Sequence, residues 1–106
     1  MTIRVQPAAR TDILRQVGYY AELGRPDVAE RFLAAVEAAF SSLQATPAAG
    51  TPKQFAHPDL SGLRSWPVRG FEDIRLYYIE HEQELTVLRI LHGRRDIDGI
   101  FNDEGG

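Results

Sequence analysis

The residues best suited to chemistry form a string near the end of the chain, His92-Gly93-Arg94-Arg95-Asp96, where an apolar stretch gives way to charge. An imidazole, two guanidiniums and a carboxylate together could bind phosphate, with His92 as general acid or base. The same string also suits a glycine turn whose surface arginines pair with Asp96 and Asp98, with His92 packed at a strand end. On this string alone, the structural interpretation is favoured over the catalytic one.

Metal and cofactor chemistry find little support in the sequence. The three histidines, His57, His81 and His92, fall in different segments without the spacing of metal ligands. There is no cysteine, hence no thiolate site and no disulfide. No glycine-rich phosphate loop appears either. We therefore expect neither a metal nor a cofactor.

Aromatic and arginine side chains are interleaved between residues 64 and 78, a pattern that could stack nucleic-acid bases on a sheet. The aromatics are Trp66, Phe71, Tyr77 and Tyr78, and the arginines are Arg64, Arg69 and Arg75. Glu72 and Asp73 in this region, with Glu80, Glu82 and Glu84 just after it, would repel a phosphate backbone, and the net charge is −3. We expect packing aromatics and no direct DNA binding by this chain alone. An arginine-dotted sheet instead suits an acidic, amphipathic protein segment.

Length and charge set the remaining bounds. The 106 residues make one domain, 1–106, with a single core. Eleven of the 12 basic residues are arginine, which favours bidentate recognition over a diffuse positive field. Six of them lie in the second half: Arg64, Arg69, Arg75, Arg89, Arg94 and Arg95. No apolar run approaches membrane-spanning length and no signal-peptide core is present, so we expect a cytoplasmic protein without membrane association.

A sheet must position these side chains. Residues 63–68, 73–80 and 84–91 read as three short strands joined by tight connections, an antiparallel meander. The last strand is apolar on both faces, so we place it inside the sheet. One face then takes its cover from this chain, and the other is available to a partner.

Two helices precede the meander. Residues 2–6 alternate like a short strand that Pro7 ends, and from Ala8 the apolar period becomes helical. The second helix starts near Pro26, carries the strongest apolar stripe of the chain and ends at Thr46-Pro47. The short link between them predicts an antiparallel hairpin. Residues 47–62 look too irregular for any regular element.

In this order the elements resemble the RelE/ParE superfamily of bacterial toxins from type II toxin–antitoxin systems. The resemblance covers nearly the whole chain and is strongest at Gly62-Leu63-Arg64, at residues 74–78 and at residues 88–96. It implies an α+β fold, a twisted antiparallel sheet with the helical hairpin on one face.

The superfamily has a ribosome-dependent ribonuclease branch and a ParE branch. The chain resembles the nucleases at Arg75 and Arg95, where that branch carries transition-state arginines. Where it uses lysines on the second strand and a C-terminal tyrosine, this chain has Trp66, Val68 and Phe101, which cannot transfer a proton. The string at 88–96 is similar instead to the ParE branch, known as DNA gyrase poisons rather than nucleases, so the resemblance favours a toxin that is not a ribonuclease and leaves open whether it is an enzyme. The resemblance therefore implies a gyrase-inhibiting toxin neutralised by a ParD-like antitoxin, a ribbon-helix-helix dimer with an acidic or amphipathic tail.

We expect the target or the antitoxin to bind through arginines and through apolar positions of the second helix. The candidates are Arg64, Arg69, Arg75, His92, Arg94, Arg95, Phe40 and Leu43. Two other functions stay open. One is an mRNA endonuclease with the arginines as its clamp and His92 as proton carrier. The other is a non-toxic remnant that only binds an antitoxin.

Overall fold

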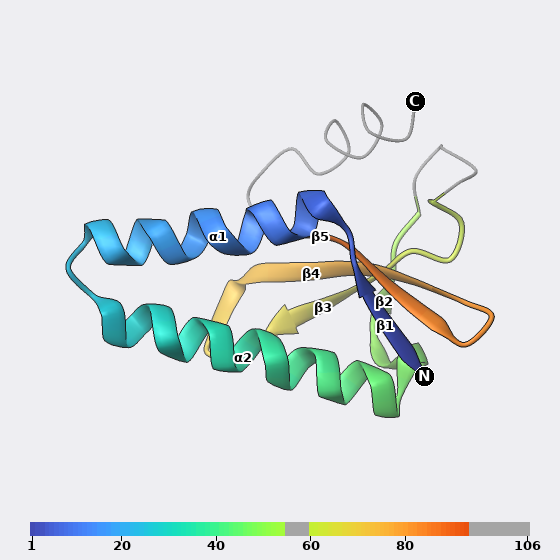
Figure 1. The fold of residues 1–106 in the computed structure, drawn as a ribbon. Helices are drawn as coiled ribbons and strands as arrows, with labels where there is room; N and C mark the ends of the chain where they lie inside the picture. Colours follow the sequence, from blue (N-terminus) through green and yellow to red (C-terminus); the bar gives the residue numbers. More distant parts are fainter. Residues whose placement is uncertain (55–59, 94–106) are drawn as a thin grey trace.

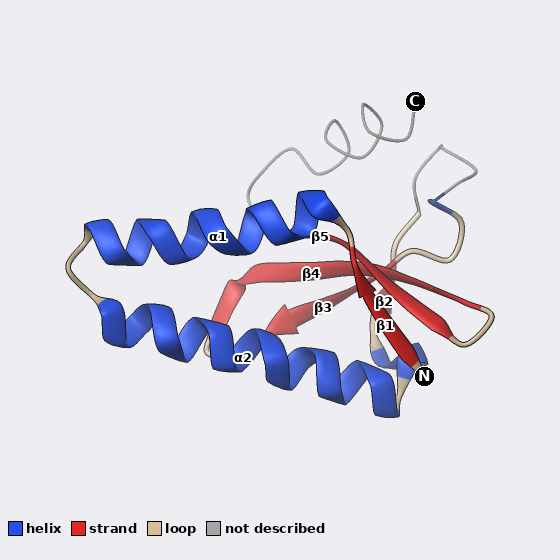
Figure 2. Cartoon of the chain, viewed as in Figure 1, coloured by secondary structure: helices blue, strands red, loops and turns tan. Residues whose placement is uncertain are grey.

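The computed structural model describes residues 1–54 and 60–93, which form two layers, a helical hairpin on one face of a five-stranded sheet (Figure 1). The elements are β1 (Thr2–Val5), α1 (Pro7–Glu22), α2 (Pro26–Ala45), the 3-10 turn η1 (Pro47–Ala49), β2 (Thr51–Pro52), β3 (Arg64–Val68), β4 (Phe71–His81) and β5 (Glu84–His92). This is the expected α+β class, and Figure 2 shows the separation of helices from strands.

The helical hairpin begins and turns where the sequence predicts. Pro7 and Pro26 each stand in the first turn of a helix, where their missing N–H costs nothing. Gly24 takes φ +71° in the link between the helices. Asp27 lies in the first turn of α2, and its hydrogen bonds from the Arg25 guanidinium lower its pKa to about 2.

The main core lies between the hairpin and the sheet. The apolar stripe of α2 supplies Phe32, Val36, Ala39 and Leu43, all buried. They pack on sheet residues that include Val68, Leu76, Tyr78, Leu85 and Val87. The predicted stripe of α2 is thus confirmed as the surface that fixes the hairpin to the sheet.

The sheet has the order β1-β5-β4-β3-β2, so β5 is an interior strand, as predicted. Its meander is antiparallel, but β1 pairs with β5 in parallel, with Ile3 opposite Leu85. The sheet is therefore mixed, where we expected an antiparallel one. The hairpin returns the chain to the start of β1, where the Gln44 side chain donates to the Met1 carbonyl oxygen at 3.1 Å. β3 and β5 therefore run in the direction of β1, whereas β2 and β4 run against it.

The two apolar faces of β5 arise partly from a β-bulge. Tyr77 pairs with Arg89 and Tyr78 with Val87, which leaves Leu88 without a partner in the register. Leu88 and Leu91 belong to a second apolar cluster on the face away from the helices, with Leu60, Leu63 and Tyr77. This chain itself thus covers part of the face that we had reserved for a partner.

The segment after α2 is more regular than predicted, since it contains η1 and the short strand β2. Its order comes from side chains of distant strands. The Tyr78 hydroxyl donates to the Pro47 carbonyl at 2.6 Å and accepts from the Gly50 N–H at 2.9 Å. Arg64 Nη1 donates to the carbonyls of Ala48 and Gly50 at 3.1 and 2.7 Å. Elements this short leave no periodic trace in a sequence.

Candidate functional site

The structure does not bring the predicted binding residues together at one site. Arg64, Arg69, Arg75 and His92 stand at four separate places, and Arg94 and Arg95 lie outside the described residues. Arg64 is half-buried, and its guanidinium is engaged by the carbonyls of residues 48 and 50. It therefore acts first as an anchor of the α2–β2 connection.

Arg75 lies on the sheet face away from the helices. Its Nε and Nη2 donate to the Ser65 hydroxyl at 3.2 and 3.0 Å, and its strand neighbours are Pro67 and Leu91. In the described part of the chain Nη1 makes no hydrogen bond, so one edge of a half-buried guanidinium can still receive a carboxylate. Next to it, burial raises the pKa of Tyr77, an effect that the charge of Arg75 partly opposes.

Arg69 stands at a groove between α2 and β3, called here the α2–β3 groove. It has a volume of about 150 Å³ and is lined by Ala35, Ala38, Ala39, Ser42, Trp66, Pro67 and Arg69. The small α2 side chains allow a partner's apolar face to come close, and Arg69 is exposed beside them. This combination of apolar side chains and an exposed guanidinium suits an amphipathic, acidic segment.

The predicted apolar contacts on α2 need correction. Leu43 is fully buried in the core, so it offers no accessible contact, and Phe40 is half-buried against the same core. The accessible positions are Ala35, Ala38 and Ser42, one helix face away. Their spacing of three and four residues is visible in the sequence, but small side chains carry too weak a hydrophobic signal to single them out.

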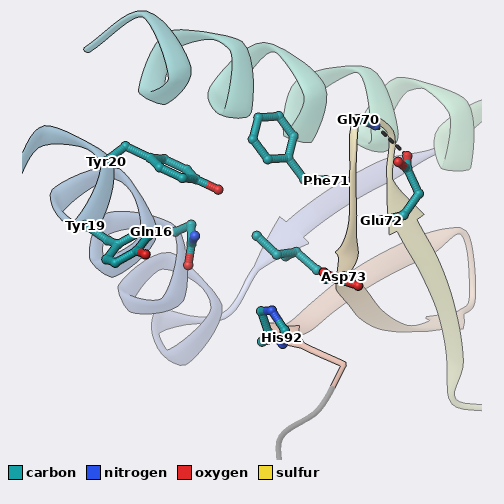
Figure 3. A pocket seen from close by; sticks show the side chains of 9 residues that line it. Gln16, Tyr19, Tyr20, Gly70, Phe71, Glu72, Asp73 and His92 are labelled. Carbon is teal, nitrogen blue, oxygen red and sulfur yellow. Dashed lines mark hydrogen bonds between the residues drawn. The ribbon is translucent and has the colours of Figure 1, made fainter. Parts of the chain in front are cut away.

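His92 ends β5 and lines a pocket of about 600 Å³ at the far end of the sheet (Figure 3). The other lining residues are Gln16, Tyr19, Tyr20, Gly70, Phe71, Glu72, Asp73 and Ile74. Tyr20 and Phe71 face each other with ring centroids 5.9 Å apart. The Glu72 carboxylate accepts the Gly70 N–H across the β3–β4 turn, and the Gly93 N–H donates to the Asp73 carbonyl.

The described lining of this pocket combines aromatic rings, carboxylates and one imidazole. Its described lining residues include no serine, threonine or lysine, and the groups beside His92 that could exchange a proton are Tyr19, Tyr20, Glu72 and Asp73. The sequence did not point to Gln16 and Tyr19, because α1 positions with helical spacing read first as packing. Within residues 1–54 and 60–93, no three acidic or histidine side chains are grouped to hold a metal ion.

In the part of the chain that the structure describes, neither helix is long and apolar enough to span a bilayer.

The fold, a helical hairpin on one face of a five-stranded sheet, is shared with two solved structures. The chain belongs to the family described as ParE toxin of type II toxin-antitoxin system, parDE, whose sequence model matches residues 3–97. Among solved structures it is similar to "Chromosomal ParDE TA system from P. aeruginosa", with TM-score 0.68 and 21% identity over 87% of this chain and 95% of that one. It is also similar to "YoeB/ParE toxin from Agrobacterium tumefaciens", with TM-score 0.55 and 15% identity over 87% of this chain and 98% of that one. No curated protein matches the sequence.

Proposed function

We propose that this ParE-family toxin inhibits DNA gyrase and is neutralised by a ParD-like antitoxin. The family supports a toxin with an antitoxin partner, and one similar structure comes from a ParDE system. The sequence resemblance supplies gyrase as the target. A gyrase poison acts in the bacterial cytoplasm, so the proposal includes that location.

The observation that favours gyrase over messenger RNA as the target is the set of side chains that β3 carries on its two faces. The positions matched to the catalytic lysines of the nucleases hold Trp66 and Val68, and both pack in the core beneath the helices. The opposite face of β3 carries Ser65 and Pro67, which pair with Tyr77 and Arg75. Neither face of this strand therefore presents a lysine or any other group able to exchange a proton near neutral pH.

The α2–β3 groove is the proposed contact for the antitoxin. An apolar helix face resting on Ala35, Ala38 and Ser42 would bring its polar flank to Arg69. A carboxylate there gains a charge-assisted hydrogen bond, and the desolvated centre of such a contact contributes more than its rim. On the other face of the sheet, Arg75 offers a second guanidinium to a chain that wraps around the toxin.

The test is a titration of the purified chain into two assays, gyrase supercoiling of relaxed plasmid and translation of a reporter messenger RNA. We expect loss of supercoiling with accumulation of cleaved DNA, intact messenger RNA, and recovery when a ParD-like antitoxin is added. Arg75→Ala is assayed beside Arg31→Ala, an exposed arginine of α2 that serves as control.

The other outcomes are equally distinct. Cuts in messenger RNA that vanish in Arg75→Ala, but not in Arg31→Ala, would replace gyrase by the ribosome. Inactivity in both assays, with the antitoxin still bound, would identify the chain as a binding remnant.

A further inference from the structure

The two edges of the sheet are built differently. At one edge, β2 has only two residues, and Pro52 has no N–H to offer a further strand. At the other edge, β1 has four residues and no proline. Short strands and prolines are the usual means by which a protein blocks edge pairing, and only the β2 edge uses them.

The hydrogen bonds of β1 show which backbone groups face outward. The Thr2 N–H donates to the Gln83 carbonyl at 3.1 Å, and the Gln6 N–H donates to the Val87 carbonyl at 3.0 Å. Backbone groups of successive strand residues point to opposite edges, so those of Ile3 and Val5 point away from β5. They have no hydrogen-bond partner within the described residues. Their side chains pack on the main core, which holds the open edge in place.

A groove of about 370 Å³ runs beside the end of β1, lined by Val5, Pro7, Arg10, Thr11 and Leu14. Leu14 is 64% exposed, the largest fraction among the exposed large apolar side chains of the described residues. A strand added to β1 would place alternate side chains in this groove, against Leu14 and within reach of Arg10.

The opposite face of the same edge is also basic. Arg4 has a side chain 67% exposed, and its nearest carboxylate, Glu84, lies 3.8 Å away on the neighbouring strand. Because most of the Arg4 side chain is exposed and Glu84, itself 43% exposed, lies to one side of it, Arg4 remains accessible to a second carboxylate. Guanidiniums thus stand on both sides of the open edge.

We propose that the open edge of β1 accepts an extended segment of a partner protein that carries carboxylates, one apolar side chain resting on Leu14 and the acidic ones turned to Arg4 and Arg10. Main-chain hydrogen bonds to Ile3 and Val5 supply the pairing, and the arginines select the charge. A second copy of this chain fits less well. An antiparallel register that uses both Ile3 and Val5 places Arg4 opposite its own copy, and like charges directly opposite destabilise a sheet.

The test follows amide hydrogen exchange in the full chain by NMR, with two short capped peptides as probes, one alternating valine with glutamate and one alternating valine with lysine. We expect the glutamate peptide to slow exchange of the Ile3 and Val5 amides by about tenfold or more, because their N–H groups become hydrogen-bonded. The Thr51 amide at the blocked edge should not change. The lysine peptide should leave all three amides unaffected.

Matched variants locate the contact. The double variant Arg10→Glu, Leu14→Glu should lose the protection, while Arg31→Glu, Leu33→Glu, which changes the same residue types on the exposed side of α2, should keep it. Arg4→Glu, a single change at an exposed side chain, should also weaken the protection of the Ile3 and Val5 amides. It tests the contact independently if the double variant does not fold.

Four results would overturn the proposal. They are equal protection by the lysine peptide, protection of Thr51, no protection by either peptide, and protection that grows with protein concentration when no peptide is present. The last would assign the edge to a second copy of the chain.

Discussion

Asp12 of α1 and Arg89 of β5 form a buried, bidentate ion pair that joins the helical layer to the sheet. Arg89 Nε lies 2.8 Å from Asp12 Oδ2, and Nη2 lies 3.0 Å from Oδ1. The same Oδ2 accepts the Ile90 N–H at 2.9 Å. The side chains are only 4% and 10% exposed. Arg89, one of the six arginines of the second half of the chain, therefore connects β5 to α1 inside the protein, beside the bulge of β5.

Removing one partner of this ion pair should cost much of the stability of the chain. Asp12→Ala removes the carboxylate that pairs with the buried Arg89 guanidinium, so we expect a loss of about 3–5 kcal/mol in the free energy of unfolding. Urea denaturation followed by circular dichroism measures it. Asp27→Ala, which breaks the exposed pair with Arg25, is the control and should shift the midpoint little.

The double variant Asp12→Leu, Arg89→Met separates charge burial from packing. If the single loss comes from an unpaired charge, the apolar pair should recover a large part of it. The single variants Asp12→Leu and Arg89→Met complete the comparison. If the double variant loses as much stability as these two singles together, packing and not charge pairing fixes α1 to the sheet.

Gly50 should be intolerant of any side chain. A Cβ at this position would overlap the Tyr78 hydroxyl and lie 2.9 Å from the Ser65 carbonyl oxygen. We expect Gly50→Ala to destabilise the chain by about 1–3 kcal/mol, as overpacking does. Gly18→Ala is the matched control, because nothing lies within 4 Å of its Cβ in α1. It should stabilise by about 0.5–1 kcal/mol through helix propensity. Equal effects at both glycines in thermal melts would contradict the close approach of Tyr78.

The Tyr78 hydroxyl should stabilise the folded chain at neutral pH, and its ionisation should account for part of the loss of stability at alkaline pH. Tyr78→Phe leaves the buried Gly50 N–H without its acceptor, at a cost of about 1–3 kcal/mol. Burial also raises the pKa of Tyr78 above its ordinary value of 10.0, although the Gly50 hydrogen bond and Arg64 oppose it. The folded state therefore holds the phenol proton more tightly than the unfolded state.

The sign of the pH effect follows from that difference. The stabilising contribution is complete below pH 10 and is lost as the pH rises from 10 toward the folded pKa. Thermal melts between pH 8 and pH 11 should show a steeper alkaline decline in the wild type than in Tyr78→Phe. Tyr77 contributes a residual slope of the same sign, since burial raises its pKa as well. Tyr19→Phe, at an exposed tyrosine of α1, controls for the removal of a phenol.

The sequence predicts the elements whose side chains repeat with a regular period. It does not predict the direction of a strand in the sheet or contacts between residues far apart in the chain. The stripe of α2 and the strands of the meander follow from apolar spacing alone. A period of two does not encode whether β1 runs parallel to β5, and it hides the bulge at Leu88. Asp12 reads as a polar helix residue because its partner lies 77 positions away.

The candidate site shows the same limit. Arginine type is visible in the sequence, but burial and hydrogen bonding divide the arginines into different roles. Arg64 and Arg89 hold the fold together, whereas Arg69 is exposed beside a groove. The groove itself was missed because alanine and serine carry no strong pattern, and Leu43 was chosen because leucine does.

This division of the arginines yields the last prediction. Arg69→Ala should weaken binding of a ParD-like antitoxin without lowering the melting temperature, since Arg69 makes no hydrogen bond or ion pair within the described residues. A rim contact costs little, whereas truncating one member of a desolvated charge pair costs about 2–5 kcal/mol, and calorimetric titration distinguishes the two. Arg64→Ala should do the reverse: it loses the hydrogen bonds to Ala48 and Gly50, lowers the melting temperature and affects antitoxin binding only through the fold. Arg31→Ala, exposed on α2, controls for the loss of one positive charge. If Arg69→Ala binds the antitoxin as tightly as Arg31→Ala does, the α2–β3 groove is not the contact surface.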